Sequence, residues 1–509
     1  MLANCNMRLR RRGDLLPVVG VGLTYVPGME PLIREEGESL QVLEIEPQTL
    51  WLRTRGESGF RVDQGRFDYV RALPGVKLLH SVGYPVGGYH RAEADQLHML
   101  NQMIAAFNPP WMSEHLAFNR ATASHGVFQT GFLLPPLQTE KGVRAAASSV
   151  QCLAKQVGVP LAVEHGVSYL KLRDGELPDG AFLRSVAEAA DCGIVLDLHN
   201  AWTNASNGRQ AVEHFFKDIP LERVWEVHLA GGMEYEGYWL DAHSGEIPKP
   251  VLDLAREAIP RLPNLKALIF EVMPVYLESI GLATIRAQLD ELRRLWELRD
   301  KTGEPTDLQV QTLRRLSVAR RGRADGITPE IWENTLGALA IGREVDTPLA
   351  RQLSSDLGVS VFRYLVAEFR ASSVIGTLPF TGRLLLLSMG AESFEAMLGD
   401  YWRDHPPEAF GAEEARQFAT FLQTRAGKIP HLEEVMRFDL AAIAAITEGT
   451  PETVCFSQDP RHVLGALADH RLPTGSPAGL YYADLRSDGI TFRSEPKARQ
   501  RTGFDRFPL

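Results

Sequence analysis

One loop near the middle of the chain gathers side chains of the kind that bind metal ions. The stretch 224-VWEVHLAGGMEYEGYWLDAHSGEIP-248 contains His228, Asp241 and His243 in a segment rich in glycine and aromatic residues. Imidazoles and carboxylates are common ligands of iron, zinc and manganese. Asp241 and His243 also point to the same side of an extended segment, because side chains alternate along it. The loop alone fits a metal site and also a surface loop with two incidental histidines.

The same kinds of side chain follow other short apolar runs. They are His80, Glu114, His115, Glu164, His165, Asp197, His199, Asn200 and Glu271. For any one of them, a buried structural histidine or a capping carboxylate is the more ordinary explanation. Burying so many ionisable groups together is costly unless they share metal ions. The set as a whole therefore indicates a metal centre.

Eight apolar runs predict strands, and amphipathic segments between them predict helices. The expected strands are 17–23, 41–45, 76–81, 111–116, 159–164, 193–198, 224–229 and 265–271, and the clearest helices are 91–107, 140–158, 179–192, 209–219, 249–259 and 278–300. Parallel strands need such crossovers, so the pattern favours a (β/α)8 TIM barrel over residues 17–300. An open doubly wound sheet is the alternative, although the chain lacks a GxGxxG motif after its first strand. In a barrel, the active site lies at the carboxyl ends of the strands, where the polar residues fall.

The ligand types restrict the metal only in part. None of these positions is a cysteine. Several carboxylates and histidines could hold two or three ions, which suits non-heme iron with oxygen chemistry or a hydrolytic zinc or manganese cluster.

Several motifs, in order along the chain, resemble those of the multinuclear non-heme iron-dependent oxidases, the family of the methanobactin biosynthesis oxidase. They are HSVGYPVGG from His80, SEHL from Ser113, VEHGVSY from Val163, LDLHNAWTNA from Leu196, VHLAGG from Val227, DAHSGEIP from Asp241 and LIFEV from Leu268. The resemblance implies a xylose isomerase-like barrel with two or three iron ions. It also implies dioxygen as co-substrate and a ribosomally made precursor peptide whose residues, often cysteines, are modified.

The matching motifs imply which residues carry the site. The implied iron ligands are His80, His115, Glu164, Asn200, His228, Asp241, His243 and Glu271. Glu114 and Asp197 are the implied catalytic groups, which would support a ligand or move a proton.

The chain also departs from the family pattern. The second strand of the family usually ends in a His-x-Glu-Asn type motif, and here it reads EIEPQTLW, with Glu46, Gln48 and Thr49. His165 follows Glu164 in place of asparagine, and Gly232 stands where the family commonly has another histidine. His165 could replace a lost ligand or orient one. These changes border the cluster, so they bear on the number of ions and on the reaction.

The C-terminal third has a different character. After a tail at 1–16 and the barrel, the polar segment 300–307 reads as a linker, residues 308–447 as a helical domain and 448–509 as a small α+β module. Residues 401–441 resemble the partner proteins encoded beside these oxidases. This resemblance implies a fused peptide-recognition domain, in which the last module could hold the peptide by strand addition. The alternative is a helical domain that stabilises the barrel or a dimer.

Composition limits the partners and the compartment. The net charge of −10 argues against a nucleic-acid surface. No apolar run approaches the roughly 20 residues that cross a bilayer. The four scattered cysteines predict a reducing, cytoplasmic location. Composition does not define the oligomeric state.

These observations favour a peptide-modifying oxidase dependent on iron and dioxygen. Trp202, Tyr235, Tyr238 and Trp239 could shape its peptide channel or simply pack. A zinc or manganese isomerase or hydrolase on the same barrel is one alternative, and a non-catalytic scaffold is another.

Overall fold

The computed structural model describes most of the chain. It covers residues 15–55, 59–91, 93–123, 126–299, 326–425, 429–475 and 477–494, with the backbone of 506 and 507. Nearly all of the expected tail at 1–16, and all of the expected linker at 300–307, lie outside these residues.

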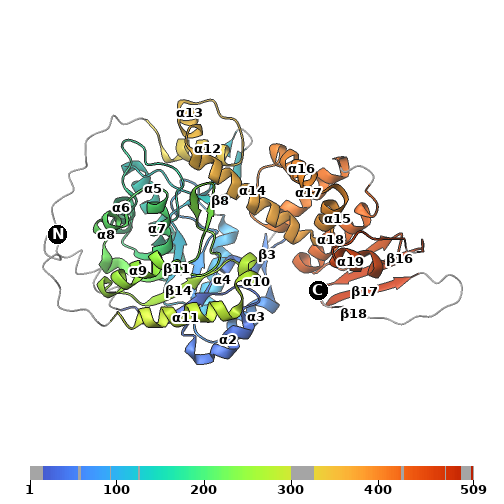
Figure 1. Ribbon diagram of the computed structural model, residues 1–509, viewed down its shortest axis with the longest axis horizontal. Helices are drawn as coiled ribbons and strands as arrows, with labels where there is room; N and C mark the ends of the chain where they lie inside the picture. Colours follow the sequence, from blue (N-terminus) through green and yellow to red (C-terminus); the bar gives the residue numbers. More distant parts are fainter. Residues whose placement is uncertain are drawn as a thin grey trace.

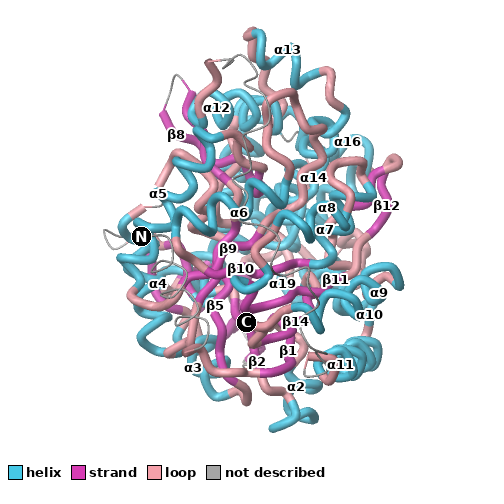
Figure 2. Tube along the Cα trace, turned by 90° about the vertical axis from the view of Figure 1, so that its left-hand side faces the viewer, coloured by secondary structure: helices cyan, strands magenta, loops and turns pink. Residues whose placement is uncertain are grey.

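Eight parallel strands form a closed barrel, in which β1 pairs with both β2 and β14 (Figure 2). The strands are β1 (Gly20–Thr24), β2 (Val42–Ile45), β5 (Val76–Ser81), β6 (Met112–His115), β9 (Leu161–Glu164), β10 (Gly193–Asp197), β11 (Val224–Ala230) and β14 (Ala267–Glu271). Nearly every strand residue is buried, because side chains facing out pack under helices and side chains facing in fill the barrel. The predicted TIM barrel is confirmed, and closure excludes the open sheet.

Helices surround the barrel and return the chain from one strand to the next. They are α2 (Glu30–Glu36), α3 (Gln64–Ala72), α4 (Ala94–Phe107), α5 (Glu140–Val157), α6 (Asp179–Ala190), α7 (Leu198–Ser206), α8 (Val212–Asp218), α9 (Lys249–Ala258), α10 (Leu277–Ile280) and α11 (Leu282–Trp296). Local sequence sets their ends, as in α5, where the Thr139 hydroxyl accepts a hydrogen bond from the Gly142 amide at 3.4 Å.

Three hairpins follow strands of the barrel and build up its carboxyl end. They are β3–β4 (Trp51–Arg53 and Phe60–Val62), β7–β8 (Phe118–Ala123 and Gly126–Leu134) and β12–β13 (Met233–Tyr235 and Tyr238–Leu240). They lie at the end of the barrel that the sequence predicts for the site.

The C-terminal third is helical and ends in a small sheet. Its helices are α12 (Pro329–Ala340), α13 (Pro348–Ser354), α14 (Leu357–Thr377), α15 (Pro379–Met389), α16 (Ala391–Asp404), α17 (Gly411–Arg425) and α18 (Leu432–Glu448). An antiparallel sheet follows, in the order β15 (Glu452–Phe456), β16 (Tyr481–Arg486), β17 (Gly489–Ser494) and β18 (Arg506–Phe507), with α19 (Pro460–Ala468) after β15. Ser355 and Asp356 separate α13 from α14, and the Asp356 carboxylate caps α14 by accepting from the Gly358 amide at 2.9 Å.

The C-terminal helices share a hydrophobic core with loops of the barrel. Phe118, Leu134 and Tyr169 pack in one buried cluster with Trp332 and Phe362. Figure 1 shows α12 and α13 over the end of the barrel, and α14 leading from there to the remaining helices. The helical region is therefore part of the wall around the carboxyl end of the barrel.

Polar contacts join the two regions a second time. The Arg61 guanidinium donates to the carbonyls of Thr447, at 2.6 Å, and Ile446. Arg53 pairs with Glu413 at 3.1 Å.

Among the described helices, none is long and apolar enough by itself to cross a bilayer, although α14 and α15, bent by 110° relative to each other, pass that test as a pair.

The buried ion pair Arg370–Glu414 yields a prediction for the stability of the helical region. The two side chains are 3% and 2% exposed and lie 2.7 Å apart. Replacing Arg370 with leucine leaves Glu414 charged and buried, which should lower the free energy of unfolding by about 3–5 kcal/mol. Urea denaturation followed by circular dichroism measures this loss.

The exposed pair Arg403–Asp400 provides the control, with an Arg403 side chain 71% exposed. Arg403→Ala should change stability by less than about 1 kcal/mol. Equal losses in the two variants would contradict the role given to the buried pair.

Candidate metal centre

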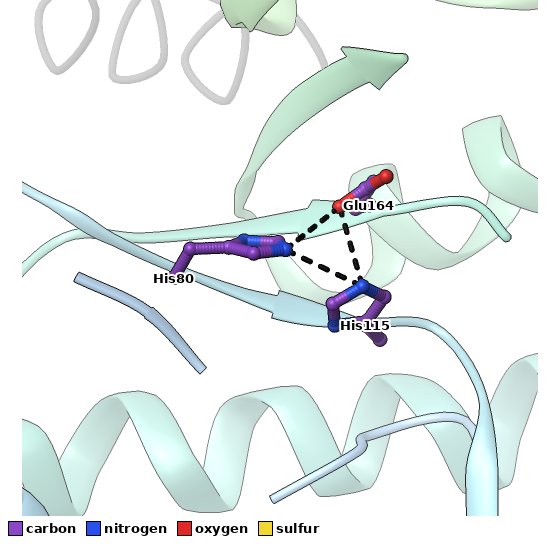
Figure 3. Close-up of side chains that lie close together, drawn as sticks. All are labelled: His80, His115 and Glu164. Carbon is purple, nitrogen blue, oxygen red and sulfur yellow. Dashed lines mark hydrogen bonds and ion pairs between the residues drawn. The ribbon is translucent and has the colours of Figure 1, made fainter. Parts of the chain in front are cut away.

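Three neighbouring strands bring His80, His115 and Glu164 together at the carboxyl end of the barrel. His80 belongs to β5, His115 ends β6 and Glu164 ends β9. The Glu164 Oε2 atom lies 3.1 Å from His80 Nε2 and 3.6 Å from His115 Nε2. The two Nε2 atoms are 3.3 Å apart, and the three side chains converge (Figure 3). Parallel register explains the meeting, because His115 pairs directly with Glu164.

Four further groups of three residues extend this arrangement around the barrel. In each group the ligand atoms all lie within 4.8 Å of one another. The groups are His80–His228–Glu271, Glu44–Glu226–His228, Glu164–Asp197–His228 and Asp197–His243–Glu271. His228 belongs to three of these groups and stands at the centre of the cluster. Its Nδ1 atom lies 3.4 Å from Glu271 and 3.9 Å from Glu164.

Several buried polar atoms in the cluster lack a hydrogen-bond partner in the part of the chain that the structure describes. They are Glu44 Oε2, Glu164 Oε2, Asp197 Oδ2, Asn200 Oδ1, Glu226 Oε1 and both ring nitrogens of His228. An unsatisfied buried polar atom costs about 1–3 kcal/mol. Metal cations are the partners that carboxylate oxygens and neutral imidazole nitrogens share. The donor set therefore fits a metal centre with mixed nitrogen and oxygen ligands.

Burial and neighbouring charges shift the pKa values of several residues in the cluster. Burial lowers the pKa of His80, but Glu44 and Glu164 outweigh burial and raise it to about 10. Burial raises the pKa of Glu271, but His228 and His243 outweigh burial and hold it below its usual range. The pKa of Asp197 rises well above its usual value because it is buried beside other carboxylates. Carboxylates in this position require positive charge nearby, from imidazolium groups or from metal ions.

Asp241 and His243 form a pair at the rim. The His243 Nε2 atom lies 3.0 Å from Asp241 Oδ1, and His199 Nδ1 approaches the same oxygen at 3.1 Å. Among the described residues, Asp241 is absent from the groups of three, whereas His243 belongs to one. His243 has a φ of 47°, which is strained for a residue other than glycine. The Met273 amide donates to the His243 carbonyl at 3.1 Å and holds this conformation.

Asn200, Glu114 and Asp197 lie beside the cluster with different contacts. The Asn200 side-chain amide donates to Glu164 Oε1 at 3.1 Å. The Glu114 carboxylate accepts from the amides of His115, at 2.8 Å, and Tyr84, at 3.0 Å. Asp197 Oδ1 caps α7 by accepting from the backbone amide of Asn200 at 2.7 Å. The other oxygen, Oδ2, has no hydrogen-bond partner among the described residues, and Asp197 belongs to two of the groups of three. Glu114 thus orients the backbone that carries His115, while Asp197 has an oxygen to offer to a metal.

Glu44 and Glu226 belong to the cluster but escaped the sequence reasoning. Both are fully buried inside the barrel, and His228 Nε2 lies 3.3 Å from Glu44 Oε2 and 3.6 Å from Glu226 Oε1. The Trp111 indole donates to the other Glu226 oxygen at 2.8 Å. The sequence did contain a signal for Glu226. It lies two positions before His228 in an apolar strand, and residues two apart face the same side of a strand.

The three departures from the family pattern have distinct surroundings. Burial raises the pKa of Glu46, while His80 opposes the rise and Glu271 adds to it. The His165 ring packs on Phe215, with centroids 4.7 Å apart, and joins none of the candidate metal-binding groups found among the described residues. The space beside Gly232 is filled by Trp239 and His199.

Comparison with known proteins places this barrel and cluster in a family. The family described as "RiPP precursor modification enzyme MbnB/TglH/ChrH", where RiPP denotes a ribosomally synthesised and post-translationally modified peptide, matches residues 19–273. The chain belongs to this family of enzymes, as its motifs predict.

Curated relatives extend over the same region. A UPF0276 protein of Anaeromyxobacter sp. (strain Fw109-5) is 30% identical over 231 residues, which cover 45% of this chain and 80% of the relative. A UPF0276 protein of Chromobacterium violaceum is 27% identical over 250 residues, covering 49% and 89%.

Solved structures with a similar barrel are more distant. Endonuclease IV from Thermus thermophilus is 16% identical with a TM-score of 0.34, over 54% of this chain and all of that one. A xylose isomerase domain containing protein from Salmonella typhimurium is 15% identical with a TM-score of 0.37, over 55% and 97%.

The geometry predicts that divalent cations stabilise the fold through this cluster. An ion at 100 times its dissociation constant should add about 2.7 kcal/mol to the free energy of unfolding. Mn²⁺ added to chelator-treated protein should therefore raise its melting temperature. His80→Ala should reduce that rise, because it removes one ligand of two groups.

The matched control is His98→Ala, which changes an exposed histidine on α4. Its response to Mn²⁺ should equal that of the unmodified protein. An unchanged response in His80→Ala, measured by differential scanning calorimetry, would exclude His80 as a ligand.

Proposed function

We propose that this protein is a non-heme iron and dioxygen-dependent oxidase that modifies residues, such as cysteine, of a ribosomally synthesised precursor peptide. One observation carries the proposal: groups of histidine and carboxylate ligands overlap around His228 at the carboxyl end of a barrel of this family. The overlap of these groups suits a centre of two or three ions, because Glu164, His228 and Glu271 each belong to more than one group.

The proposed iron ligands are His80, His115, Glu164, Asn200, His228, Asp241, His243 and Glu271, and the contacts add Asp197 as a further candidate. Iron ions held there supply the electrons and open coordination positions that dioxygen chemistry needs. Imidazoles bind such ions when neutral and carboxylates when ionised, so metal binding would release the protons that the raised pKa values of His80 and Asp197 retain.

Other residues of the chain position these ligands and shape the entrance. Glu114 fixes the backbone of His115 and Tyr84 through two hydrogen bonds, so its role is positioning. The aromatic side chains of Trp202 and Trp239 pack edge to face, with centroids 5.1 Å apart. The Trp239 indole donates to His199, whose other ring nitrogen lies 3.1 Å from Asp241 Oδ1. In this proposal the two tryptophans line the channel by which the peptide reaches the cluster.

The metal assignment is tested with protein purified without oxygen. Elemental analysis should find iron, and O2 uptake should depend on the precursor peptide, which a short reading frame next to the gene would identify. His228→Ala and His243→Ala should each lower the iron content sharply while circular dichroism shows a folded barrel, because each removes one imidazole ligand. His98→Ala, on the outer helix α4, should keep full iron content.

Different outcomes separate the alternatives. Zinc as the only bound metal, without O2 uptake, would replace the oxidase with a hydrolase or isomerase. Full iron content in both histidine variants would overturn the ligand assignment, and failure to bind any metal after reconstitution would leave a scaffold.

The proposal assigns peptide recognition to the C-terminal module, residues 448–509. In the described sheet β15 is an edge strand that pairs with β16 on one side. An edge strand offers backbone groups to an added strand, which is how several domains bind extended peptides. The alternating exposed side chains of β15, including Cys455, leave one of its faces accessible.

Two exposed cysteines allow a matched test of this assignment. Cys455 lies on β15 and Cys152 on α5 of the barrel, whereas Cys192 is buried and therefore protected from reagents. With Cys5 changed to serine, variants that keep only Cys455 or only Cys152 can be labelled with an environment-sensitive dye. The precursor peptide should alter the fluorescence at Cys455 and leave that at Cys152 unchanged. A response at Cys152 alone would place the peptide elsewhere.

A further inference from the structure

Gly232 leaves space that two other side chains occupy. A Cβ atom at this position would lie 2.3 Å from Trp239 Nε1, 2.4 Å from the Leu240 carbonyl oxygen and 2.6 Å from His199 Nε2. Atoms at such distances clash, so any side chain at position 232 would displace both rings. Trp239 and His199 can therefore touch only because residue 232 is a glycine.

That contact fixes the proton on His199. The Trp239 indole N–H donates to His199 Nε2 at 2.9 Å. An indole nitrogen can only donate, so His199 Nε2 must be the acceptor and carry no proton. The neutral ring therefore holds its proton on Nδ1, which lies 3.1 Å from Asp241 Oδ1 and donates to it. His199 is fully buried, so water does not compete for either nitrogen.

Both partners are held by α7 and the hairpin that faces it. His199 lies on α7, and Asn207, which caps the end of this helix, bonds the Trp239 backbone through both side-chain atoms, at 2.8 and 2.9 Å. Trp202, one turn after His199, packs edge to face on Trp239. The geometry of the chain of hydrogen bonds is thus set before any ligand binds.

We propose that Trp239 and His199 are positioning residues that orient the Asp241 carboxylate toward the metal centre. This inference rests on the ligand role of Asp241 in the proposed function. With Oδ1 held by His199, the carboxylate cannot rotate freely, and it stays beside His243, whose Nε2 lies 3.0 Å from the same oxygen. Carboxylate ligands are commonly fixed by such hydrogen bonds, and losing one lowers metal affinity by about 10–100-fold.

Trp239→Phe tests the proposal, because it removes the N–H donor and keeps an aromatic ring. The probe is Co²⁺, whose affinity is measured by competition with a chelator and whose visible absorption reports the ligand geometry. We expect the affinity to fall about 10–100-fold, with a shifted absorption band. Unfolding of the metal-free protein should change little. Gly232→Ala should have the same effect, because its methyl group separates Trp239 from His199.

Substitutions of His199 separate positioning from packing. His199→Asn keeps an N–H near the place of Nδ1 and should retain most of the Co²⁺ affinity. His199→Gln places its amide near the position of Nε2 and should lose most of the Co²⁺ affinity. In the His199→Asn background, Trp239→Phe should have little further effect. His98→Ala, which changes an exposed residue of α4, should match the unmodified protein and serves as the control.

The outcomes distinguish this proposal from the proposed function. Unchanged Co²⁺ affinity and absorption in Trp239→Phe, while His243→Ala lowers the affinity, would overturn the positioning role alone. A protein that binds no Co²⁺ would overturn both proposals. Equal losses in His199→Asn and His199→Gln would also overturn the positioning role, since packing alone would then explain the effect.

Discussion

Carboxylates buried within a few ångströms of one another repel, and the candidate metal-binding groups at the centre of this barrel contain five of them: Glu44, Glu164, Asp197, Glu226 and Glu271. Their mutual repulsion in a medium of low polarity exceeds what ordinary hydrogen bonds offset. Positive charge must lie among them, and the four histidines of the same groups are arranged to supply it or to share it with metal ions. The closed barrel makes this arrangement possible, because its parallel strands end side by side and cannot move apart without losing their hydrogen bonds.

Much of the barrel and of its cluster was predictable from the sequence for one reason. Buried parallel strands are continuous apolar runs, and a polar side chain at the end of such a run stands out. His80, His115, Glu164, His228 and Glu271 were found in this way, and the structure brings them together. The family match over residues 19–273 confirms the resemblance that the motifs suggested.

Other features depend on distances that a linear pattern does not contain. Glu44 and Glu226 lie inside strands, where the apolar neighbours hide a single carboxylate, and only closure of the barrel shows that both face His228. Gly232 looked like the loss of a histidine, yet the space belongs to Trp239 and His199, from a hairpin and a helix. The break between α13 and α14 depends on a single capping residue, Asp356, which the spacing of apolar residues does not reveal.

The core shared by the rim of the barrel and helices α12–α14 bears on how such proteins can be recombined. Tyr235 of the β12–β13 hairpin stacks on Tyr364 of α14, with ring centroids 3.9 Å apart, and the same hairpin carries Trp239. A chimera joined in the segment 300–325 would pair one protein's rim loops with another's helices. A functional hybrid must instead keep the hydrophobic contact intact. The β7–β8 and β12–β13 hairpins should therefore be exchanged together with α12–α14.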